Sequence, residues 1–581
     1  MARGRRAGRI CAWTGIERRF ETRLRTRPIE IRNPIRGQPA RSRGQHPGAI
    51  EFDGTPEDTC SATNQEQEGS MKRRTFIACL AAFAVGALTP AAMSPSGSMA
   101  TTGSGSAAAL FTPAVGQAVF VSASSTPPTE AECYAVGIRC FTPASMANAY
   151  NYAVLHDLGN QGQGVTIAII DSFGSDTIRH DLHVFNQAFG LQELCGEEGV
   201  TCAPGMPTFE ILSLQGSPAS NPPPPNNGTG LESKLGWAIE TSLDVEWAHA
   251  TAPKANILLV TTPTAETLGV QGFPQMMNAL QYVVDHGLAS VISMSFGAGE
   301  GSFQGGLAAL QQIRQAMIDA QANRVTLLAS SGDGGSTNIL KEPVKNPAPI
   351  PYPSVIWPAS DPLVTSVGGT RLCVDAVTGI GVDVTDPPTV CAPAVNPASQ
   401  RETAWPPSGG GYSIIFPRPA FQNTLPAGST FVGSSAGAPG PNSNMRGVPD
   451  VAYQASPGTG GLIYITLPPF NTTSDVSCGS TPCSTGWYLG GGTSSSAPQW
   501  AGLIAIADQM AGRRLGYINP ALYQIANDPA KYANDFFDVT VNCNQRSSIA
   551  GYCASPGWDA VTGLGTPNAA NLIPDLIAAT P

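Results

Sequence analysis

Charged residues are scarce in this chain, and it has no apolar run long enough to cross a membrane. Asp, Glu, Lys and Arg make up 13% of the 581 residues, about half of the usual share in globular proteins. Hydrophobic residues reach 42%, and the 64 Gly and 51 Pro indicate a loop-rich folded protein rather than a disordered one. The length exceeds one ordinary domain and suits one large enzyme domain with appendages.

Positive charge is concentrated at the beginning of the chain. Residues 1–74 hold 16 of the 32 Lys and Arg residues, but only 9 of the 42 Asp and Glu residues. The rest of the chain therefore has 16 basic against 33 acidic residues. This balance excludes nucleic acid as a partner and leaves no polybasic patch for a membrane surface.

The first hundred residues are predicted to lie outside the folded enzyme. Residues 1–70 are rich in Arg and lack apolar periodicity, so we expect translation to start at Met71 and the upstream segment to be untranslated or disordered. Residues 71–100 have the pattern of an export signal, a basic start followed by a short apolar run. Arg73-Arg74 leaves both a twin-arginine and an ordinary secretory route open. Either route predicts a secreted, periplasmic or extracellular protein without a stable membrane anchor.

Cysteine usage agrees with export. Without Cys11, Cys60 and Cys79, ten of the thirteen cysteines remain. They fall into sequence-local pairs that predict five short-loop disulfides, although spacing alone does not fix connectivity: Cys133/Cys140, Cys195/Cys202, Cys373/Cys391, Cys478/Cys483 and Cys543/Cys553. No Cys-x-x-Cys pair occurs, which argues against a zinc site.

Strand and helix patterns alternate along the remaining chain. Residues 101–132 predict a Ser/Ala/Pro-rich linker or short pro-segment, and residues 133–581 one folded domain. Apolar runs with β-branched residues predict buried parallel strands at 164–171, 255–262, 289–296 and 325–330. Helical spacing predicts helices at 235–250, 274–286 and 303–322. The fold class is therefore α/β, a doubly wound and mostly parallel sheet flanked by helices, with the active site at the carboxyl ends of the strands. Surface loops are predicted at 221–230 and 373–391.

Three motifs could carry chemistry. Ser494 lies in a Gly-Gly-Thr-Ser-Ser-Ser-Ala-Pro run at a predicted helix start, where small residues admit a substrate closely, although a capping turn has the same pattern. Glu240 and Asp244 are one helical turn apart and could share a proton, although a solvated helix face would also explain them. Asp333 follows a buried strand in Ser-Ser-Gly-Asp-Gly-Gly, a sequence that also suits a simple turn.

Together these motifs resemble the sedolisin family of serine-carboxyl peptidases, which have a subtilisin-like fold and act in acid. The resemblance covers essentially the whole chain from residue 141 to the C-terminus. Within it, further family-like segments follow in order at 240–260, 293–297, 367–370, 409–413 and 448–452. The resemblance implies a single large catalytic domain that cleaves protein or peptide substrates. We expect it to be a monomer.

The resemblance also implies residue roles. Ser494 would be the nucleophile, Glu240 its general base, Asp244 the acid that orients Glu240, and Asp333 the donor to the oxyanion. The backbone of Ser295, Phe296 and Gly297 would bind an extended substrate as an added strand.

One structural Ca²⁺ ion is implied near the C-terminus. Its ligands would be the side chains of Asp538 and Asp559 and the carbonyls of Val539, Ser555 and Gly557, a set of hard oxygen donors. Ser555 stands where the family often has Gly, which matters little for a carbonyl ligand.

Two further features depart from the family pattern. Family precursors usually carry a folded propeptide of well over a hundred residues, whereas only a short stretch separates Ala100 from Cys133 here, so activation by removal of a large prodomain is in doubt. Ser495 replaces the usual Ala after the nucleophile, which is a mild change.

Two alternatives remain at this stage. Asp171, at the end of a predicted strand, would suit an ordinary subtilisin, but no His-Gly-Thr-His segment follows it, so Ser494 would lack an imidazole base and Asp171 is predicted to be structural. His180 and His183 are predicted to be solvated surface rather than a metal pair.

The second alternative is a catalytically inactive extracellular binding protein, which could keep the same fold, although all four candidate catalytic residues are retained.

Overall fold

The computed structural model describes residues 117–581 except 215–229, 264–271, 304, 312, 339–349, 385–389, 430–443, 473–475, 480 and 546–548. All described residues belong to one compact unit, Ala100–Pro581. The predicted upstream segment 1–70, the export signal 71–100 and nearly all of the Pro-rich loop 221–230 lie outside the described residues. No helix in the described part of the chain is both long and apolar enough to cross a membrane.

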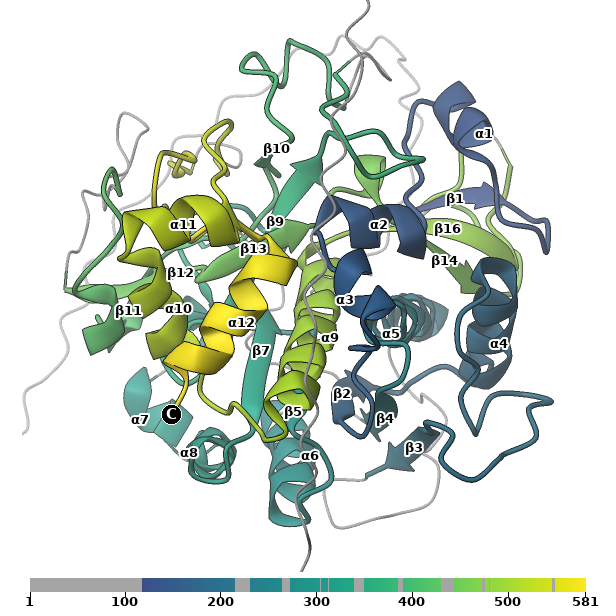
Figure 1. The fold of residues 1–581 in the computed structure, drawn as a ribbon, viewed down its shortest axis with the longest axis horizontal. Coiled ribbons are helices and arrows are strands. Elements are labelled where there is room, and N and C mark those ends of the chain that lie inside the picture. The colour runs from purple at the N-terminus through teal and green to yellow at the C-terminus, as the bar shows by residue number, and fades with distance from the viewer. Residues whose placement is uncertain are drawn as a thin grey trace, which may run out of the picture. The chain divides into compact units, whose positions relative to one another are not determined.

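A mostly parallel sheet forms the centre of this unit (Figure 1). Its strands, in spatial order, are β10 (Glu402–Ala404), β9 (Thr365–Leu372), β7 (Thr326–Ser330), β5 (Val291–Met294), β2 (Thr166–Ser172), β4 (Asn256–Thr262) and β3 (Phe209–Ser213), and β13 (Val451–Gln454) also pairs with β9. Only the β9–β10 pair among them is antiparallel. The predicted α/β class and parallel sheet are confirmed.

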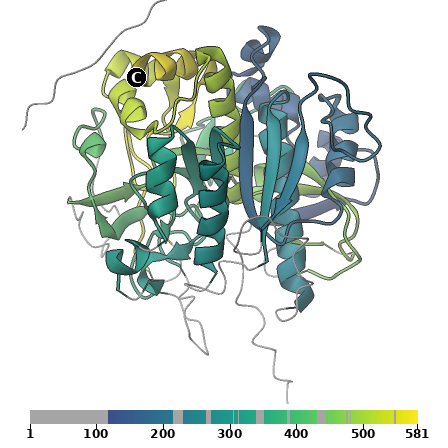
Figure 2. The ribbon, with the colours of Figure 1, turned by 90° about the horizontal axis from the view of Figure 1, so that it is seen from below.

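The strands supply both faces of the core because successive side chains point to opposite sides. In β2, Ile167 and Ile169 belong to one apolar cluster, while Ala168 and Ile170 belong to the other. The first cluster is completed by α5 (Gly230–Thr251) and α9 (Thr493–Ala511), and the second by α6 (Phe273–Asp285) and α8 (Gln315–Ala322). The two helix layers lie on opposite sides of the strands in Figure 2.

Helices α5 and α9 pack closely along each other. Gly502 of α9 permits this, since a methyl group built on it would lie 2.5 Å from Cβ of Thr251 in α5. The helices predicted at 235–250 and 274–286 are confirmed as parts of α5 and α6.

The single helix predicted at 303–322 is wrong, because the structure divides it into α7 (Leu307–Gln311) and α8. Gly305 and Gly306 have φ values of +100° and +55°, which prevents a helix from starting at Phe303. Arg314, between the two helices, is bound through Nη2 to Asp361 at 2.9 Å.

A second sheet includes the first described strand. Strand β1 (Ala118–Ser122) lies between β16 (Gly486–Gly490) and β15 (Val476–Ser477), and β14 (Gly461–Ile465) pairs with the other edge of β16. Helix α1 (Glu130–Ala135) follows. Both β1 and the start of α1 fall inside the segment 101–132, for which a linker or pro-segment was predicted, so the packed chain begins before Cys133.

The remaining elements surround these two sheets (Figure 1). They are α2 (Pro143–Ala149), α3 (Ala153–Asp157), α4 (Ile178–Phe189), β6 (Ala298–Gly299), η2 (Glu300–Ser302), β8 (Ile356–Trp357), β11 (Gly411–Pro417), η3 (Ala420–Gln422), β12 (Met445–Val448), η4 (Pro457–Thr459), α10 (Asn519–Ala526), α11 (Pro529–Asp535), β17 (Phe536–Phe537), β18 (Thr566–Pro567) and α12 (Ala569–Ala579).

All five predicted disulfides are present with the predicted local pairing. The Cys373–Cys391 bridge closes a loop in which Val377 and Ile380 are each 67% exposed. This exposure confirms the predicted surface loop there.

Candidate active site

The carboxyl ends of neighbouring parallel strands bring the candidate residues to one edge of the sheet. Asp171 lies near the end of β2, Ser295 directly follows β5, and Asp333 follows β7. Strands β2, β5 and β7 are adjacent in the sheet. This edge is where ligands bind in open α/β sheets.

Ser494 is the second residue of α9. The helix begins after Gly492, whose φ of +87° strongly favours a residue without a side chain. Pro498, within the same helix, has no N–H to donate to the carbonyl of Ser494, four residues before it. The sequence thus builds a tight turn into a helix start, with Ser494 in the first turn.

Asp333 is attached to this helix start. Its Oδ1 accepts hydrogen bonds from the backbone N–H of Thr493 (2.8 Å) and from Thr493 Oγ1 (2.9 Å). Thr493 Oγ1 in turn accepts the N–H of Gly332 at 2.9 Å. Hydrogen bonds therefore join the two predicted motifs around Asp333 and Ser494, which are more than a hundred residues apart in the chain.

Glu240 and Asp244 lie on α5 and are completely buried. The solvated helix face that could also explain their spacing is therefore excluded. Burial raises the pKa of Asp244 well above its usual range. The nearby carboxyls of Glu240 and Asp171 raise this pKa further, whereas the polar side chain of Ser295 nearby lowers it. Asp244 thus favours its protonated form.

Asp171, for which a structural role was predicted, is a third acid in this group. Its carboxyl is completely buried, and burial raises its pKa to about 7, although the polar side chain of Thr241 nearby opposes this shift. Its position at the end of a buried strand was the available signal. Its proximity to Asp244 arises from the packing of α5 on β2.

The predicted substrate strand Ser295 to Gly297 is buried. The ring of Phe296 packs against Phe273 with centroids 6.1 Å apart, so its side chain belongs to the core. The Ser295 side chain is also buried, close enough to Asp244 to lower the pKa of that carboxyl. The side chains of Ser295 and Phe296 are therefore not available to a peptide, and binding by the backbone of this segment stays a prediction.

Four of the five predicted calcium residues meet at one loop: Asp538, Ser555, Gly557 and Asp559. Asp538 Oδ2 accepts the N–H of Gly557 at 3.1 Å, and Asp559 Oδ2 accepts the N–H of Ser555 at 3.2 Å. Burial raises the pKa of Asp559 to about 7. Two partly or fully buried carboxyls around one short loop are an oxygen donor set that fits Ca²⁺, because a bound cation would offset the cost of ionising them.

Among the described residues, one other group has metal-like spacing: Glu130, Cys133 and Cys140. The two cysteines form a disulfide, so they supply no thiolate to a metal. His180 and His183 lie beside Glu198 (2.6 Å) and Glu197 (3.3 Å), respectively.

Two of the other three described histidines lie beside backbone carbonyls, and the third is buried. His156 Nε2 lies 2.9 Å from the carbonyl of Thr251, and His286 Nδ1 lies 2.9 Å from the carbonyl of Tyr282. Burial lowers the pKa of His249 to about 4, beside the backbone of Gln192.

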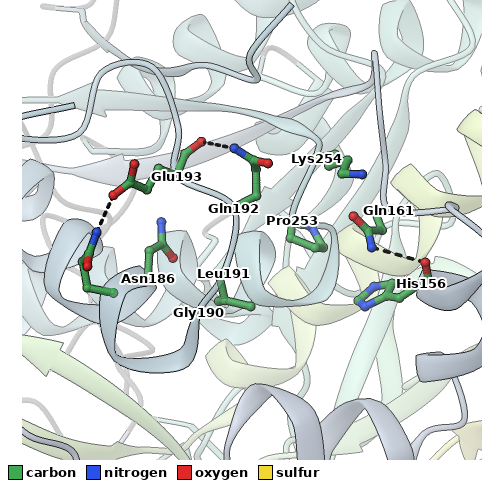
Figure 3. A pocket seen from close by; sticks show the side chains of 10 residues that line it. His156, Gln161, Asn186, Gly190, Leu191, Gln192, Glu193, Pro253 and Lys254 are labelled. Atoms are coloured by element: carbon green, nitrogen blue, oxygen red, sulfur yellow. Dashed lines mark hydrogen bonds between the residues drawn. The ribbon is translucent and has the colours of Figure 1, made fainter. Parts of the chain in front are cut away.

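A hollow of about 590 Å³ lies away from the candidate residues (Figure 3). Its lining includes Gln161 and Lys254, which precede β2 and β4 and so belong to the amino ends of the strands. His156, Asn186 and Glu193 also line it. It contains none of the predicted site residues.

Comparisons with known proteins agree with this arrangement. A family model described as "Subtilase family" matches residues 226–517, half of the chain. Kumamolisin from Bacillus sp. (strain MN-32) is 30% identical over 459 residues, which cover 77% of this chain and 66% of that relative. Tripeptidyl-peptidase 1 from Homo sapiens is 28% identical over 354 residues, 58% of this chain and 52% of the relative. The chain thus spans between about half and two thirds of the length of these relatives.

A solved structure supports the fold. Pseudomonas sedolisin, a serine-carboxyl proteinase complexed with two molecules of pseudo-iodotyrostatin, has a TM-score of 0.52 and 24% sequence identity. The match covers 75% of this chain and 98% of that one, and confirms the predicted subtilisin-like fold. The chain therefore belongs to the subtilase family and, within it, to the sedolisins.

Proposed function

We propose that this chain is a secreted, acid-acting serine-carboxyl peptidase that hydrolyses peptide bonds through an acyl-enzyme on Ser494. The observation that carries the proposal is that Asp333 is hydrogen-bonded to Thr493, the residue directly before Ser494. The neighbouring helix α5 bears the two buried acids Glu240 and Asp244. Kumamolisin, tripeptidyl-peptidase 1 and the serine-carboxyl proteinase sedolisin support the same activity by similarity.

In the first step, Ser494 Oγ attacks the carbonyl carbon of the scissile bond and its proton passes to the Glu240 carboxylate. The carbonyl oxygen becomes an oxyanion, which accepts a hydrogen bond from the protonated carboxyl of Asp333. Such a donor is worth about 3 to 4 kcal/mol of barrier. When the tetrahedral intermediate collapses, the C–N bond breaks and the departing amine takes the proton from Glu240.

In the second step, water attacks the ester carbon while Glu240 accepts a proton from it, and Ser494 leaves with that proton to complete the cycle. Asp244 keeps its own proton, since its pKa is raised, and can donate a hydrogen bond that orients the Glu240 carboxylate. Acid conditions suit this division of roles, because Asp333 and Asp244 must be protonated while Glu240 accepts a proton.

The calcium site would serve stability rather than chemistry. Asp538 and Asp559, with the carbonyls of Val539, Ser555 and Gly557, would hold the ion, whose charge would compensate the two carboxylates. The five disulfides support an oxidising, extracytoplasmic location.

The test is digestion of an unfolded protein between pH 3 and pH 7, with mass spectrometry of the products. We expect cleavage in acid that is abolished by Ser494→Ala and by Glu240→Gln, while both variants keep the native circular dichroism spectrum. Asp181→Asn, which changes a buried acid of α4, is the matched control and should stay active. Absence of cleavage by the folded wild type would favour an inactive binding relative. A histidine variant that loses the chemical step would favour a subtilisin mechanism.

A further inference from the structure

The hydroxyl of Ser495, the residue after the proposed nucleophile, lies inside the protein and bonds to two side chains. Ser495 is completely buried. Its Oγ donates to Gln454 Oε1 at 3.4 Å and accepts a hydrogen bond from Gln499 Nε2 at 3.2 Å. An Ala at this position could form neither bond. The replacement of Ala by Ser was predicted to be a mild change, but it adds a polar link behind the first turn of α9.

Backbone carbonyls fix the direction of each bond in this link, because a carbonyl only accepts hydrogen bonds. Gln499 Nε2 also donates to the carbonyl of Ser495 at 2.8 Å, and Gln454 Nε2 donates to the carbonyl of Ser456 at 2.8 Å. The amide oxygen of Gln454 is therefore the atom that accepts the Ser495 proton. Hydrogen bonds thus run in one direction, from Gln499 through the Ser495 hydroxyl to Gln454 and on to Ser456.

The residues at the end of β13 also hold the turn before Ser494. Gln454 is the last residue of β13, and the carbonyl of the next residue, Ala455, accepts the N–H of Gly492 at 2.6 Å. Gln454 and Ser495 are both completely buried, so water does not compete for the bond between them. The chain is therefore attached to this segment on both sides of Ser494, through the backbone of Gly492 and through the side chain of Ser495.

We propose that Ser495 and Gln454 are positioning residues that hold the Ser494 hydroxyl in place. Asp333 binds Thr493, the residue before Ser494, and Gln454 binds the residue after it. The two bonds together fix the helix start from which Ser494 attacks the substrate. This inference rests on the proposed peptidase function and adds two residues that act through the nucleophile rather than on the substrate.

The test measures kcat and KM at pH 4 with a synthetic peptide that spans a site at which the enzyme cleaves an unfolded protein. Ser495→Ala removes the hydroxyl, and Gln454→Leu removes its acceptor at similar size. We expect each variant to lower kcat about 10-fold with KM unchanged, because a small displacement of a reacting group slows the chemical step but not substrate binding. The double variant should lose no more than either single variant, because both changes break the same link.

Gln454→Glu separates hydrogen bonding from packing. A protonated carboxyl can accept from Ser495 and donate to the carbonyl of Ser456, as the amide does, and burial keeps it protonated in acid. We therefore expect Gln454→Glu to keep kcat within about 2-fold of the wild type at pH 4. Thr365→Val is the matched control, because it removes a buried hydroxyl bond to the amide oxygen of Asn519 (2.6 Å) at the amino end of β9. It should lower stability without changing kcat.

Three results would overturn the inference while leaving the peptidase function intact. They are a wild-type kcat in both Ser495→Ala and Gln454→Leu, a loss in Gln454→Glu as large as in Gln454→Leu, or the same loss in Thr365→Val. Ser495→Ala decides alone if Gln454→Leu does not fold. A folded wild type that cleaves neither the peptide nor an unfolded protein would instead refute the proposed function, and the role of Ser495 with it.

Discussion

Thr493 holds the carboxyl of Asp333 by two hydrogen bonds, one from its backbone N–H and one from its hydroxyl. Because Ser494 is the next residue, the spacing between the proposed nucleophile and the proposed oxyanion donor depends on the backbone of a helix start. A misplacement of about 1 Å at such a site can cost about 100-fold in rate.

Thr493→Val should therefore impair catalysis more than stability. The variant keeps the shape of the side chain but removes the bond from its hydroxyl to Asp333 and leaves the N–H of Gly332 without its acceptor. We expect kcat to fall about 10-fold or more with little change in KM. The control is Thr326→Val in β7, which removes a buried hydrogen bond from the Thr326 hydroxyl to the carbonyl of Gly516. This variant should leave kcat unchanged.

The pH profile of activity should reflect the opposed protonation states of the acids. We expect a maximum at about pH 3 to 5, near ordinary carboxyl pKa values, and a steep fall toward neutrality. Asp333→Asn should retain part of the activity and lose part of this fall, because an amide donates a hydrogen bond at any pH. Full wild-type activity at pH 8 would contradict the mechanism.

Asp171 should make the protein less stable as the pH rises. Its pKa in the folded state is about 7, above its usual value of 3.8, so the native state binds this proton more tightly than the unfolded state does. This contribution to stability is fully present below about pH 4 and is lost as the pH rises through about 7.

Asp171→Asn should therefore leave the melting temperature at pH 4 nearly unchanged and raise it relative to the wild type at pH 7.5. Differential scanning calorimetry at both pH values measures this difference. Asp285→Asn, at the end of α6, is the control and should shift neither value. Equal effects of Asp171→Asn at both pH values would show that lost packing, rather than charge, dominates.

Calcium removal should lower stability if Asp538 and Asp559 hold the ion. A ligand present at about 100 times its Kd stabilises the folded state by about 2.7 kcal/mol, so chelation should lower the melting temperature measurably. Asp559→Ala should have this lower melting temperature even when calcium is present, and chelator should not lower it further. Asp575→Ala, which breaks an ion pair with Lys531, should respond as the wild type does. A wild type indifferent to chelator would mean that the site holds no stabilising ion.

If the chain is exported as proposed, the mature protein should contain no free thiol. Its ten cysteines after residue 100 are all paired in the structure. Intact mass of the secreted form should place its start after the apolar run at 76–88, and alkylation without reduction should add nothing. A secreted species that retains residues 1–70 would contradict translation from Met71.

The sequence was sufficient for features that depend on local patterns. The strand carrying Ile167 to Ile170 was readable because every residue there is apolar, as expected for a strand covered on both faces. The disulfides could be predicted from the short spacings between their cysteines, and the turn before Ser494 could be predicted from its glycines. The helix predicted at 303–322 was wrong because Leu310 and Met317 keep a helical spacing across a break that the apolar pattern does not reveal.

Tertiary structure decided which motifs meet. Nothing near Asp171 in the chain indicates that it lies beside Asp244, and nothing near Asp333 indicates that its carboxyl is hydrogen-bonded to Thr493. These contacts arise because parallel strands from distant parts of the chain end at one edge of the sheet, where α5 and α9 pack against them. The residue types were therefore determined by the sequence, whereas the raised pKa values of Asp171 and Asp244 exist only because folding buries these two acids together.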